Sequence, residues 1–329
     1  MKSHFQFLFL VLLVAWSSTS FAQWHQFSSV AMTTPINLVI WEESLLKAET
    51  ISQEVFEEFD RIEQQMSRYI EDSELSLINR HAFEKEMQVS PSLFSVLNAA
   101  MNISSLSQGA FDISFASLGY MYDFRKKIKP TDMEIQQKLK FFHYQNISLD
   151  HKNKTIKFSK EGILIDLGGI AKGYAVDQGI EILKKYGVSS AHLSAGGDMR
   201  LLGDKQGAPW IIGIKNPRNE SEQAIILPLS DTAVSTSGDY ERFFMDDKGE
   251  RIHHILSPKT GKPVKGIRSA TILANEAITS DGLSTAVFVL GVQEGLALIN
   301  KLNGVDAIII DEFGKVHFSE GLLNVKSDK

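Results

Sequence analysis

Residues 163–177 read ILIDLGGIAKGYAVD, a short apolar run that ends in a carboxylate and two glycines before a helical pattern begins. The run from Ile163 to Leu167 predicts a buried strand. From Ile170 to Tyr186 apolar residues recur at helical spacing, and Gly187 stands where helices commonly end. The glycines allow a tight turn and a close approach of the backbone to a ligand. The fold must therefore bring a helix N-terminus, with Lys172, directly against the end of a buried segment.

This junction has two interpretations. A helix N-terminus beside Lys172 favours an anion, which points to a phosphate-bearing ligand. The alternative is an ordinary connection between a strand and a helix. The segment matches neither GxGxxG nor GxxxxGK[ST], so neither a Rossmann nor a P-loop site is predicted.

The rest of the chain mixes helical and strand patterns. Its 329 residues, 43% hydrophobic and 22% charged, are typical of a globular chain with a large core. Further helices are predicted at Glu49–Met66, Pro91–Ser107 with Ser90 as its N-cap, Thr131–Phe141 and Ser280–Leu290. Further strands are predicted at residues 191–193, 210–214, 224–229, 267–274 and 305–311, with a hairpin across 144–159. The mixture predicts an α+β or mixed α/β class.

The first 22 residues predict a signal peptide. Lys2 precedes an apolar run from Phe7 to Trp16, and small and polar residues lead to Ala22. We expect cleavage there, an exported mature chain, and a single domain over residues 23–329.

Composition excludes several kinds of site. The chain has no cysteine, so thiolate catalysis, zinc–thiolate sites, iron–sulfur clusters and lipidation of an N-terminal Cys are ruled out. Any metal must bind oxygen or imidazole ligands. The formal net charge is -6 and the basic residues are scattered, so no nucleic-acid partner is expected.

The stretch ITSDGLSTAVFVLG contains a candidate metal site. Ser280 is expected to cap a helix on which Asp281 and Thr285, four residues apart, share one face. A carboxylate and a hydroxyl suit a hard cation such as Mg²⁺, which is often bound through few protein ligands plus substrate phosphates. The alternative is plain capping, because an aspartate at a helix start is favoured by the helix dipole.

A pair of histidines, His253 and His254, precedes the turn SPKTG. Adjacent strand residues point to opposite faces, so at most one of them serves a given site.

Taken together, the ordered stretches MSRYIEDSELSLIN, GAFDIS, IDLGGIAKGYAVD, SAGGDMRLLG, AVSTSGDYERFF, HHILSPKTGKPV and TSDGLSTAVFVLG resemble the ApbE-like FAD:protein FMN transferases. The resemblance covers nearly all of the mature chain. It implies an α+β fold in which the flavin binds between two subdomains.

The resemblance also implies an activity. Family members use Mg²⁺ to cleave FAD, attach FMN through a phosphoester to a threonine of a target protein and release AMP. FAD is therefore a substrate here. By this resemblance the Gly169 carbonyl joins Asp281 and Thr285 around the metal, while Asp166 and Lys172 lie against FAD. We further expect Lys172 to contact phosphate or to order Asp166.

Other FAD contacts are carried over in the same way: Met32, Tyr69, Ala110, Phe111, Asp112 and Ile255. Because a histidine titrates near neutral pH, His254 is our candidate for the general base that deprotonates the acceptor threonine. Asp281 is the competing candidate, although the metal is expected to occupy it.

The chain departs from the family pattern at two places. Many members carry an N-terminal lipid-anchored cysteine, which is absent here, so we expect a soluble periplasmic protein without a stable membrane anchor. Ser257 replaces the aspartate that the family usually has before the proline of the SPKTG turn.

The expected acceptor is an exported flavoprotein, such as an Nqr-type or Rnf-type subunit or a periplasmic reductase. Two alternatives remain open: an FAD pyrophosphatase that transfers FMN to water, and a protein that holds FAD without turnover.

Overall fold

The computed structural model describes residues 22–323, over which helices and strands follow one another. The α-helices are α1 (Leu45–Met66), α2 (Glu74–His81), α3 (Pro91–Leu106), α4 (Ala116–Gly119), α5 (Asp132–Leu139), α6 (Ala171–Lys185), α7 (Ala277–Ile299) and α8 (Glu320–Leu323), with 3-10 turns η1 (Ile113–Phe115) and η2 (Tyr144–Asn146). The strands are β1 (Gln23–Ala31), β2 (Thr34–Glu42), β3 (Met87–Gln88), β4 (Ile147–Asp150), β5 (Thr155–Phe158), β6 (Ala191–Ala195), β7 (Asp198–Leu202), β8 (Trp210–Asn216), β9 (Asn219–Leu229), β10 (Ala233–Gly238), β11 (Phe243–Met245), β12 (Arg251–His253), β13 (Ile267–Ala274), β14 (Asp306–Asp311) and β15 (Val316–Phe318).

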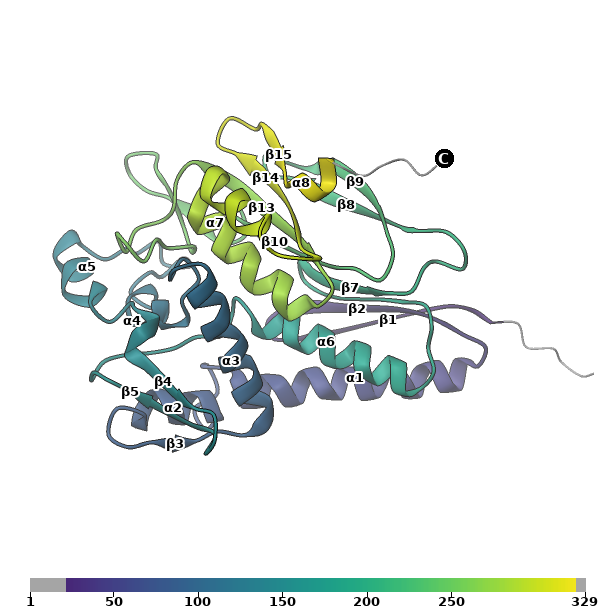
Figure 1. Ribbon diagram of the computed structural model, residues 1–329, viewed down its shortest axis with the longest axis horizontal. Helices are drawn as coiled ribbons and strands as arrows, with labels where there is room; N and C mark the ends of the chain where they lie inside the picture. The colour runs from purple at the N-terminus through teal and green to yellow at the C-terminus, as the bar shows by residue number, and fades with distance from the viewer. Residues whose placement is uncertain (1–21, 324–329) are drawn as a thin grey trace, which may run out of the picture.

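An eight-stranded antiparallel sheet in the order β1-β2-β6-β7-β10-β13-β14-β15 is the largest unit. Helices α1, α6 and α7 cover one face of it (Figure 1), and the hairpin of β8 and β9 packs on the other. Strand β10 shows the alternation: Val234 belongs to the cluster with the hairpin, whereas the next residue, Ser235, bonds to Ser280 of α7. Because both faces are covered, β13 is buried almost throughout.

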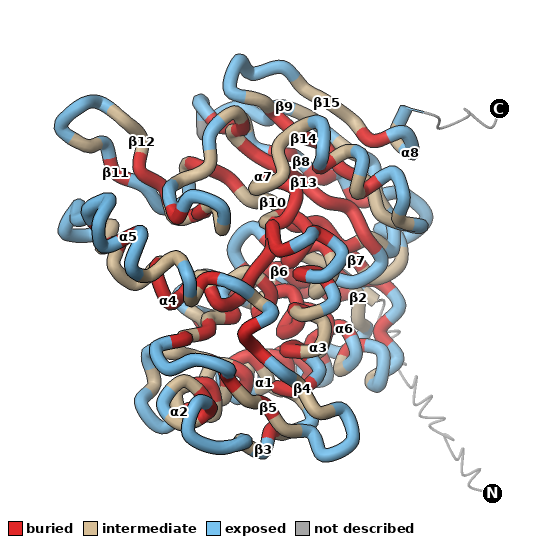
Figure 2. The backbone as a smooth tube through the Cα atoms, turned by 60° about the vertical axis from the view of Figure 1, so that its left-hand side comes forward, coloured by how far each residue is buried: buried red, intermediate tan, exposed pale blue. Residues whose placement is uncertain are grey.

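A second group of elements lies beside this sheet. Strands β3, β5 and β4 form a small antiparallel sheet, and in Figure 1 they gather with α2, α4 and α5 on the far side of α3. Figure 2 shows buried backbone concentrated along β6, β10 and β13, with exposed backbone along α5.

Most of the predicted elements are confirmed. The predicted helices correspond to α1, α3, α5, α6 and α7, the hairpin to β4 and β5, and the strands to β6, β8, β9, β13 and β14. Thr131 and Glu134 form a capping box at α5, and Gly187 follows α6 with φ 78°. Ser90 precedes α3 as predicted, but its hydroxyl bonds to Glu74 instead of capping the helix.

The predicted strand at residues 163–167 is wrong. This segment is extended but pairs with no strand of the described chain. Side chains satisfy its backbone instead: Asn79 both accepts from the Ile165 N–H at 2.8 Å and donates to its carbonyl at 2.9 Å, and Ser117 accepts from Leu164 at 2.9 Å. The backbone of a buried apolar segment can be hydrogen-bonded by a neighbouring strand or by side chains, and apolar character alone does not distinguish the two.

The predicted cap of α7 is also wrong. The helix starts at Ala277, three residues before Ser280, whose hydroxyl donates to the Ala277 carbonyl inside the first turn. Of the described helices, α7 is long and apolar enough by length and composition to span a membrane, and 44% of its most apolar window is buried in the fold. Gly291 takes φ 79° and ψ -173°, so its regular helical course is interrupted there.

Candidate active site

Helices α6 and α7 meet at their N-termini, and each supplies a carboxylate to the other. Asp281 on α7 accepts from the Gly173 N–H of α6 at 2.9 Å. Asp177 on α6 accepts from the first two N–H groups of α7, those of Ala277 at 2.9 Å and Ile278 at 2.8 Å. The approach requires glycine at 173, because a Cβ there would lie 2.2 Å from the Ala277 carbonyl oxygen. The predicted metal-ligand helix is therefore locked to the predicted phosphate-binding helix.

The three predicted metal ligands lie together at this junction. Asp281 and Thr285 are one turn apart on α7, and the position that a Cβ would take on Gly169 is 3.5 Å from the Thr285 Oγ1. A side chain at 169 would fill the space beside that hydroxyl. Burial, reinforced by the Asp198 carboxylate, raises the pKa of Asp281 well above its usual range.

These ligands fit magnesium by chemistry. A carboxylate, a hydroxyl and a backbone carbonyl are all hard oxygen donors. Within residues 22–323 no cluster of three or more His, Cys, Asp or Glu side chains is arranged to hold a metal ion. A site with so few charged ligands suits a cation that keeps waters and shares substrate phosphates, which is how Mg²⁺ is commonly held.

Lys172 pairs with Asp198, the first residue of β7, and not with Asp166. The expectation that Lys172 orders Asp166 is therefore wrong. Burial acts to lower the pKa of Lys172, but Asp198 and Asp281 outweigh it and raise that pKa above its ordinary value. The lysine is a permanent cation at the N-terminus of α6, next to the candidate metal ligands.

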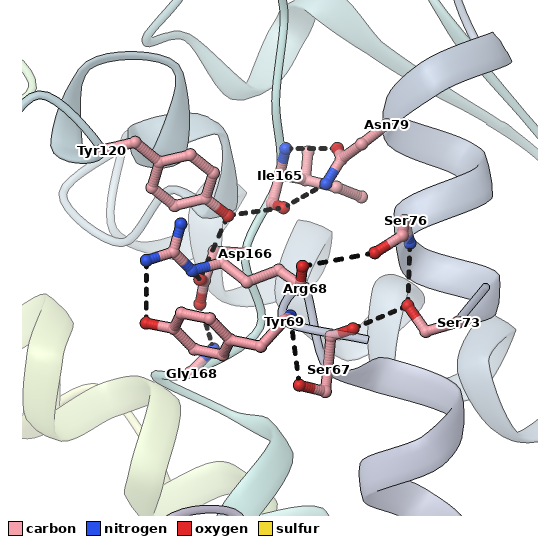
Figure 3. Close-up of polar contacts among 10 residues, drawn as sticks. All are labelled: Ser67, Arg68, Tyr69, Ser73, Ser76, Asn79, Tyr120, Ile165, Asp166 and Gly168. Carbon is pink, nitrogen blue, oxygen red and sulfur yellow. Dashed lines mark hydrogen bonds and ion pairs between the residues drawn. The ribbon is translucent and has the colours of Figure 1, made fainter. Parts of the chain in front are cut away.

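Asp166 is instead held by residues around a neighbouring cleft (Figure 3). Its Oδ2 lies 3.2 Å from Arg68 Nε and accepts from the Tyr120 hydroxyl at 3.2 Å, and its Oδ1 accepts from the Gly168 N–H at 2.6 Å. The Arg68 guanidinium carbon lies 3.6 Å from the centre of the Tyr120 ring and 4.3 Å from that of the Tyr69 ring. Both distances are within the range of a cation–π contact.

The cleft has a volume of about 350 Å³. It is lined by Arg68, Tyr69, Glu71, Ser76, Asn79, Arg80, Tyr120 and Leu164. Tyr69 is 71% exposed, so one face of its ring is free for a ligand. The segment from Asp166 to Gly169 connects this cleft with the candidate metal ligands.

The predicted contacts Ala110, Phe111 and Asp112 are all buried. The Phe111 ring lies 3.4 Å from the position of a Cβ on Gly169, so it packs directly beside the metal-ligand group. Asp112 has its oxygens occupied by this chain: Ser114 donates to Oδ1, and the Tyr144 N–H donates to Oδ2 at 2.6 Å. Burial raises the pKa of Asp112 to about 6.

His253 ends β12 and His254 follows it, and their rings contact different residues, Phe288 and Phe124 respectively. His253 bonds through Nε2 to the Val264 carbonyl at 2.8 Å, which is a structural role. The Nδ1 of His254 is buried and has no hydrogen-bond partner in the described chain. Burial, together with the nearby charge of Arg242, lowers the pKa of His254 to about 3. The expectation that it titrates near neutral pH is therefore wrong for the free protein.

The remaining predicted residues lie in turns or connecting segments. Met32 is half-buried in the tight turn between β1 and β2, with φ 52°, and its N–H donates to Glu63 at 2.8 Å. Ile255 is buried and its carbonyl accepts from Val264 at 3.1 Å. Ser257 keeps its turn intact, because its Oγ accepts from the Lys259 N–H at 3.3 Å.

A second hollow, of about 490 Å³, is lined by Ser189, Ser190, Gly203, Asp204, Gln206, Gly207, Ser230 and Asp231. None of the predicted site residues lines it, so it takes no part in the candidate site.

Sequence reasoning missed four residues that shape the site: Arg68, Tyr120, Asp177 and Asp198. Three of them, Arg68, Asp177 and Asp198, stand inside stretches already singled out by the sequence, and Arg68 is next to the predicted contact Tyr69. Their charge or ring was visible, but their partners lie far away in the sequence.

Comparisons with known proteins show which family the chain belongs to. The model of the ApbE family matches residues 32–309. A Vibrio cholerae protein named FAD:protein FMN transferase is 31% identical over 292 residues, which cover 86% of each chain. A Haemophilus influenzae protein of the same name is 32% identical over 256 residues, which cover 74% of each.

Two solved structures share the fold. The ApbE protein of Thermotoga maritima has a TM-score of 0.84 at 35% identity, over 92% of this chain and 98% of that one. The flavin transferase ApbE of Vibrio cholerae has a TM-score of 0.83 at 28% identity, over 92% and 99%. With the family model matching most of its length, and with relatives this similar over most of theirs, the chain belongs to the ApbE family.

Proposed function

We propose that the protein is an Mg²⁺-dependent FAD:protein FMN transferase that attaches FMN through a phosphoester to a threonine of an exported flavoprotein and releases AMP. Its curated relatives are named FAD:protein FMN transferase, and the protein is a transferase of this family. We further propose that it acts in the periplasm after removal of residues 1–22. Residues 1–21 lie outside the described part of the chain.

One observation carries the proposal. Gly169, Asp281 and Thr285 converge where the N-termini of α6 and α7 meet, with Lys172 beside them. A cation and a hard-metal donor set in one place suit a pyrophosphate, which carries several negative charges. A metal held here would supply charge neutralisation at the phosphates.

The reaction is a displacement at phosphorus. The threonine oxygen forms a bond to the flavin-side phosphorus, the bond from that phosphorus to the bridging oxygen breaks, and AMP leaves with that oxygen. Such transfers depend mainly on positioning and charge stabilisation. Lys172 is well placed to hold phosphate oxygens, and Tyr69 with Asp166 to hold a ring of FAD.

The proton of the threonine hydroxyl needs an acceptor, and we assign this role to the free Nδ1 of His254. Asp281 is less suited, because Gly173 already donates to its carboxylate and the metal is assigned to it. A pKa near 3 makes His254 a weak base in the free protein. Burial is the larger cause of this low pKa; bound phosphates would offset the smaller contribution of Arg242 and raise the pKa of His254.

Two other functions use the same residues. A pyrophosphatase would transfer FMN to water with the same metal, and a binding protein would hold FAD without cleaving it. The intact pair of Asp281 and Thr285 favours a metal and hence turnover.

The test is to incubate the mature chain with FAD and Mg²⁺, with and without an acceptor domain, and to follow AMP release and acceptor mass together. We expect AMP and an FMN adduct on threonine only when the acceptor domain is present together with FAD and Mg²⁺. The Asp281→Ala variant is expected to give neither AMP nor the adduct. Free FMN and AMP without any acceptor would indicate the pyrophosphatase. Tight FAD binding without AMP in either sample would indicate the binding protein. A His254→Asn variant with full transfer and an unchanged pH profile would eliminate the assigned base.

A further inference from the structure

A ladder of hydroxyl groups joins β10 to α7. Ser235 lies 2.8 Å from Ser280, and Ser237 lies 2.8 Å from Ser284. Two strand residues span about 6.7 Å and four helix residues about 6 Å, so the two rows stay in register. These four serines are buried or half-buried, and α7 runs along β10 in Figure 1.

One rung of this ladder extends to a candidate metal ligand. Ser237 Oγ also lies 3.1 Å from the Thr285 Oγ1. The rung therefore runs from Thr285 through Ser237 to Ser284, and it ends at the Asp281 carbonyl, 2.8 Å from the Ser284 Oγ.

When all three contacts are made as hydrogen bonds, the direction of every proton in this chain follows from its last member. A carbonyl oxygen only accepts, so the single proton of Ser284 is donated to Asp281. Ser284 must then accept from Ser237, which commits the proton of Ser237. Ser237 in turn can only accept from Thr285.

The consequence falls on the Thr285 hydroxyl. Its proton points toward Ser237, so its lone pairs are free on the side where Gly169 leaves space. A hydroxyl coordinates a cation through a lone pair while its proton goes to a neighbouring acceptor, and such neighbours orient the ligand.

We infer that Ser237 is a positioning residue for the metal: it holds the Thr285 hydroxyl in the orientation in which its oxygen faces the cation. The inference rests on the proposed function, because it assumes the metal site of Asp281 and Thr285.

The structure contains a matched control. Ser235 bonds to Ser280 at the same distance, and Ser280 donates to the Ala277 carbonyl at 3.1 Å. This rung has the same chemistry and joins the same two elements, but among the described residues neither of its hydroxyls has a hydrogen bond to a candidate ligand. Replacing Ser235 or Ser237 by alanine therefore removes an equivalent hydroxyl from the same interface.

The test measures Mn²⁺ affinity of the mature chain by electron paramagnetic resonance of the free ion, which does not depend on turnover. Ser237→Ala is expected to weaken binding about tenfold, in the range seen when a residue that orients a metal ligand is lost, whereas Ser235→Ala changes it less than about twofold. Ser237→Thr keeps the hydroxyl and is expected to restore most of the affinity. In the transfer assay, Ser237→Ala is expected to raise the metal concentration needed for half-maximal rate and to leave the rate at saturating metal nearly unchanged.

A double-mutant comparison identifies the route. If Ser237 acts through Thr285, then Ser237→Ala has no further effect on Mn²⁺ affinity once Thr285→Val is present. Equal affinities of Ser237→Ala and Ser235→Ala would overturn the inference and leave the proposed function standing. The proposed metal site fails if the unaltered chain does not bind Mn²⁺, or if Asp281→Ala binds it equally well. The inference then fails with it.

Discussion

Asp177 and Asp281 cap each other's helices: Asp177 of α6 accepts from the Ala277 and Ile278 N–H groups of α7, and Asp281 of α7 accepts from the Gly173 N–H of α6. The N-cap residues of α6 and α7, Ile170 and Glu276, make no side-chain hydrogen bond to their own helices. The carboxylate of the neighbouring helix therefore accepts from the first turn instead. The exchange fixes how far α7 slides along α6 and therefore where Asp281 lies.

Replacing Asp177 by alanine removes two caps and leaves Arg200, its ion-pair partner at 2.6 Å, without its anion. We expect a loss of about 2–4 kcal/mol in the free energy of unfolding, measured by urea titration. Asp150→Ala is the control, because Asp150 accepts backbone N–H groups in an exposed turn, and its replacement is expected to lower the free energy of unfolding less than that of Asp177. Equal losses for the two variants would show that the exchange between helices adds nothing.

Gly173→Ala tests the closeness of the two helices. The new Cβ would clash with the Ala277 carbonyl oxygen, which is backbone and cannot turn away. We expect a cost of about 3 kcal/mol and loss of metal binding as α7 is pushed off. Gly187→Ala, at φ 78° with open space around it, is expected to cost about 1 kcal/mol and to keep metal binding. Wild-type Mn²⁺ affinity in Gly173→Ala would refute the link between helix contact and metal site.

Lys172→Met leaves the buried Asp198 unpaired beside Asp281, so two carboxylates face each other without a cation. At pH 8 we expect a loss of about 3–5 kcal/mol, most of which is recovered when Asp198→Asn is added. Lys184→Met, which breaks an exposed pair with Glu181, is expected to cost less than about 1 kcal/mol. A double variant as unstable as Lys172→Met alone would argue against the unpaired carboxylate as the cause.

His254 predicts a specific pH dependence of stability. Its pKa is about 3 in the folded chain and about 6.5 when unfolded, so below pH 6.5 the unfolded chain binds a proton that the folded chain does not. This histidine contributes stability fully above pH 6.5, and that stability is lost as pH falls toward 3. His254→Gln lacks this loss. For each pH unit below 6.5, its free energy of unfolding should therefore rise by about 1.4 kcal/mol relative to that of the unaltered chain. Urea titrations at pH 7.5, 6 and 5 measure the difference, and a constant difference would mean that His254 titrates normally in the folded state.

The fold was predictable where a single segment carries the information. The periodicity of α1 and α6, the capping residues Thr131 and Glu134, and the hairpin of β4 and β5 are properties of neighbouring residues. The segment at 163–167 was not, because its backbone is satisfied by the side chain of Asn79, more than eighty residues earlier. The order of strands in the large sheet likewise depends on contacts between distant segments.

The same distinction applies to the site. Asp281 and Thr285 share a helix face because of their spacing, which the sequence shows. The partner of Lys172 could not be read in this way, since Asp198 and Asp166 both stand near glycine turns and only the packing of α6 against β7 selects Asp198. The low pKa of His254 also depends on burial and on Arg242, which no local pattern reveals.

The decisive measurement is the ratio of AMP released to FMN attached, with FAD, Mg²⁺ and an acceptor domain in one reaction. A transferase releases AMP in an amount equal to the modified threonine, and releases none when that threonine is replaced by valine. AMP in excess of the adduct, formed equally with the valine acceptor, would contradict protein FMN transfer as the function of this chain.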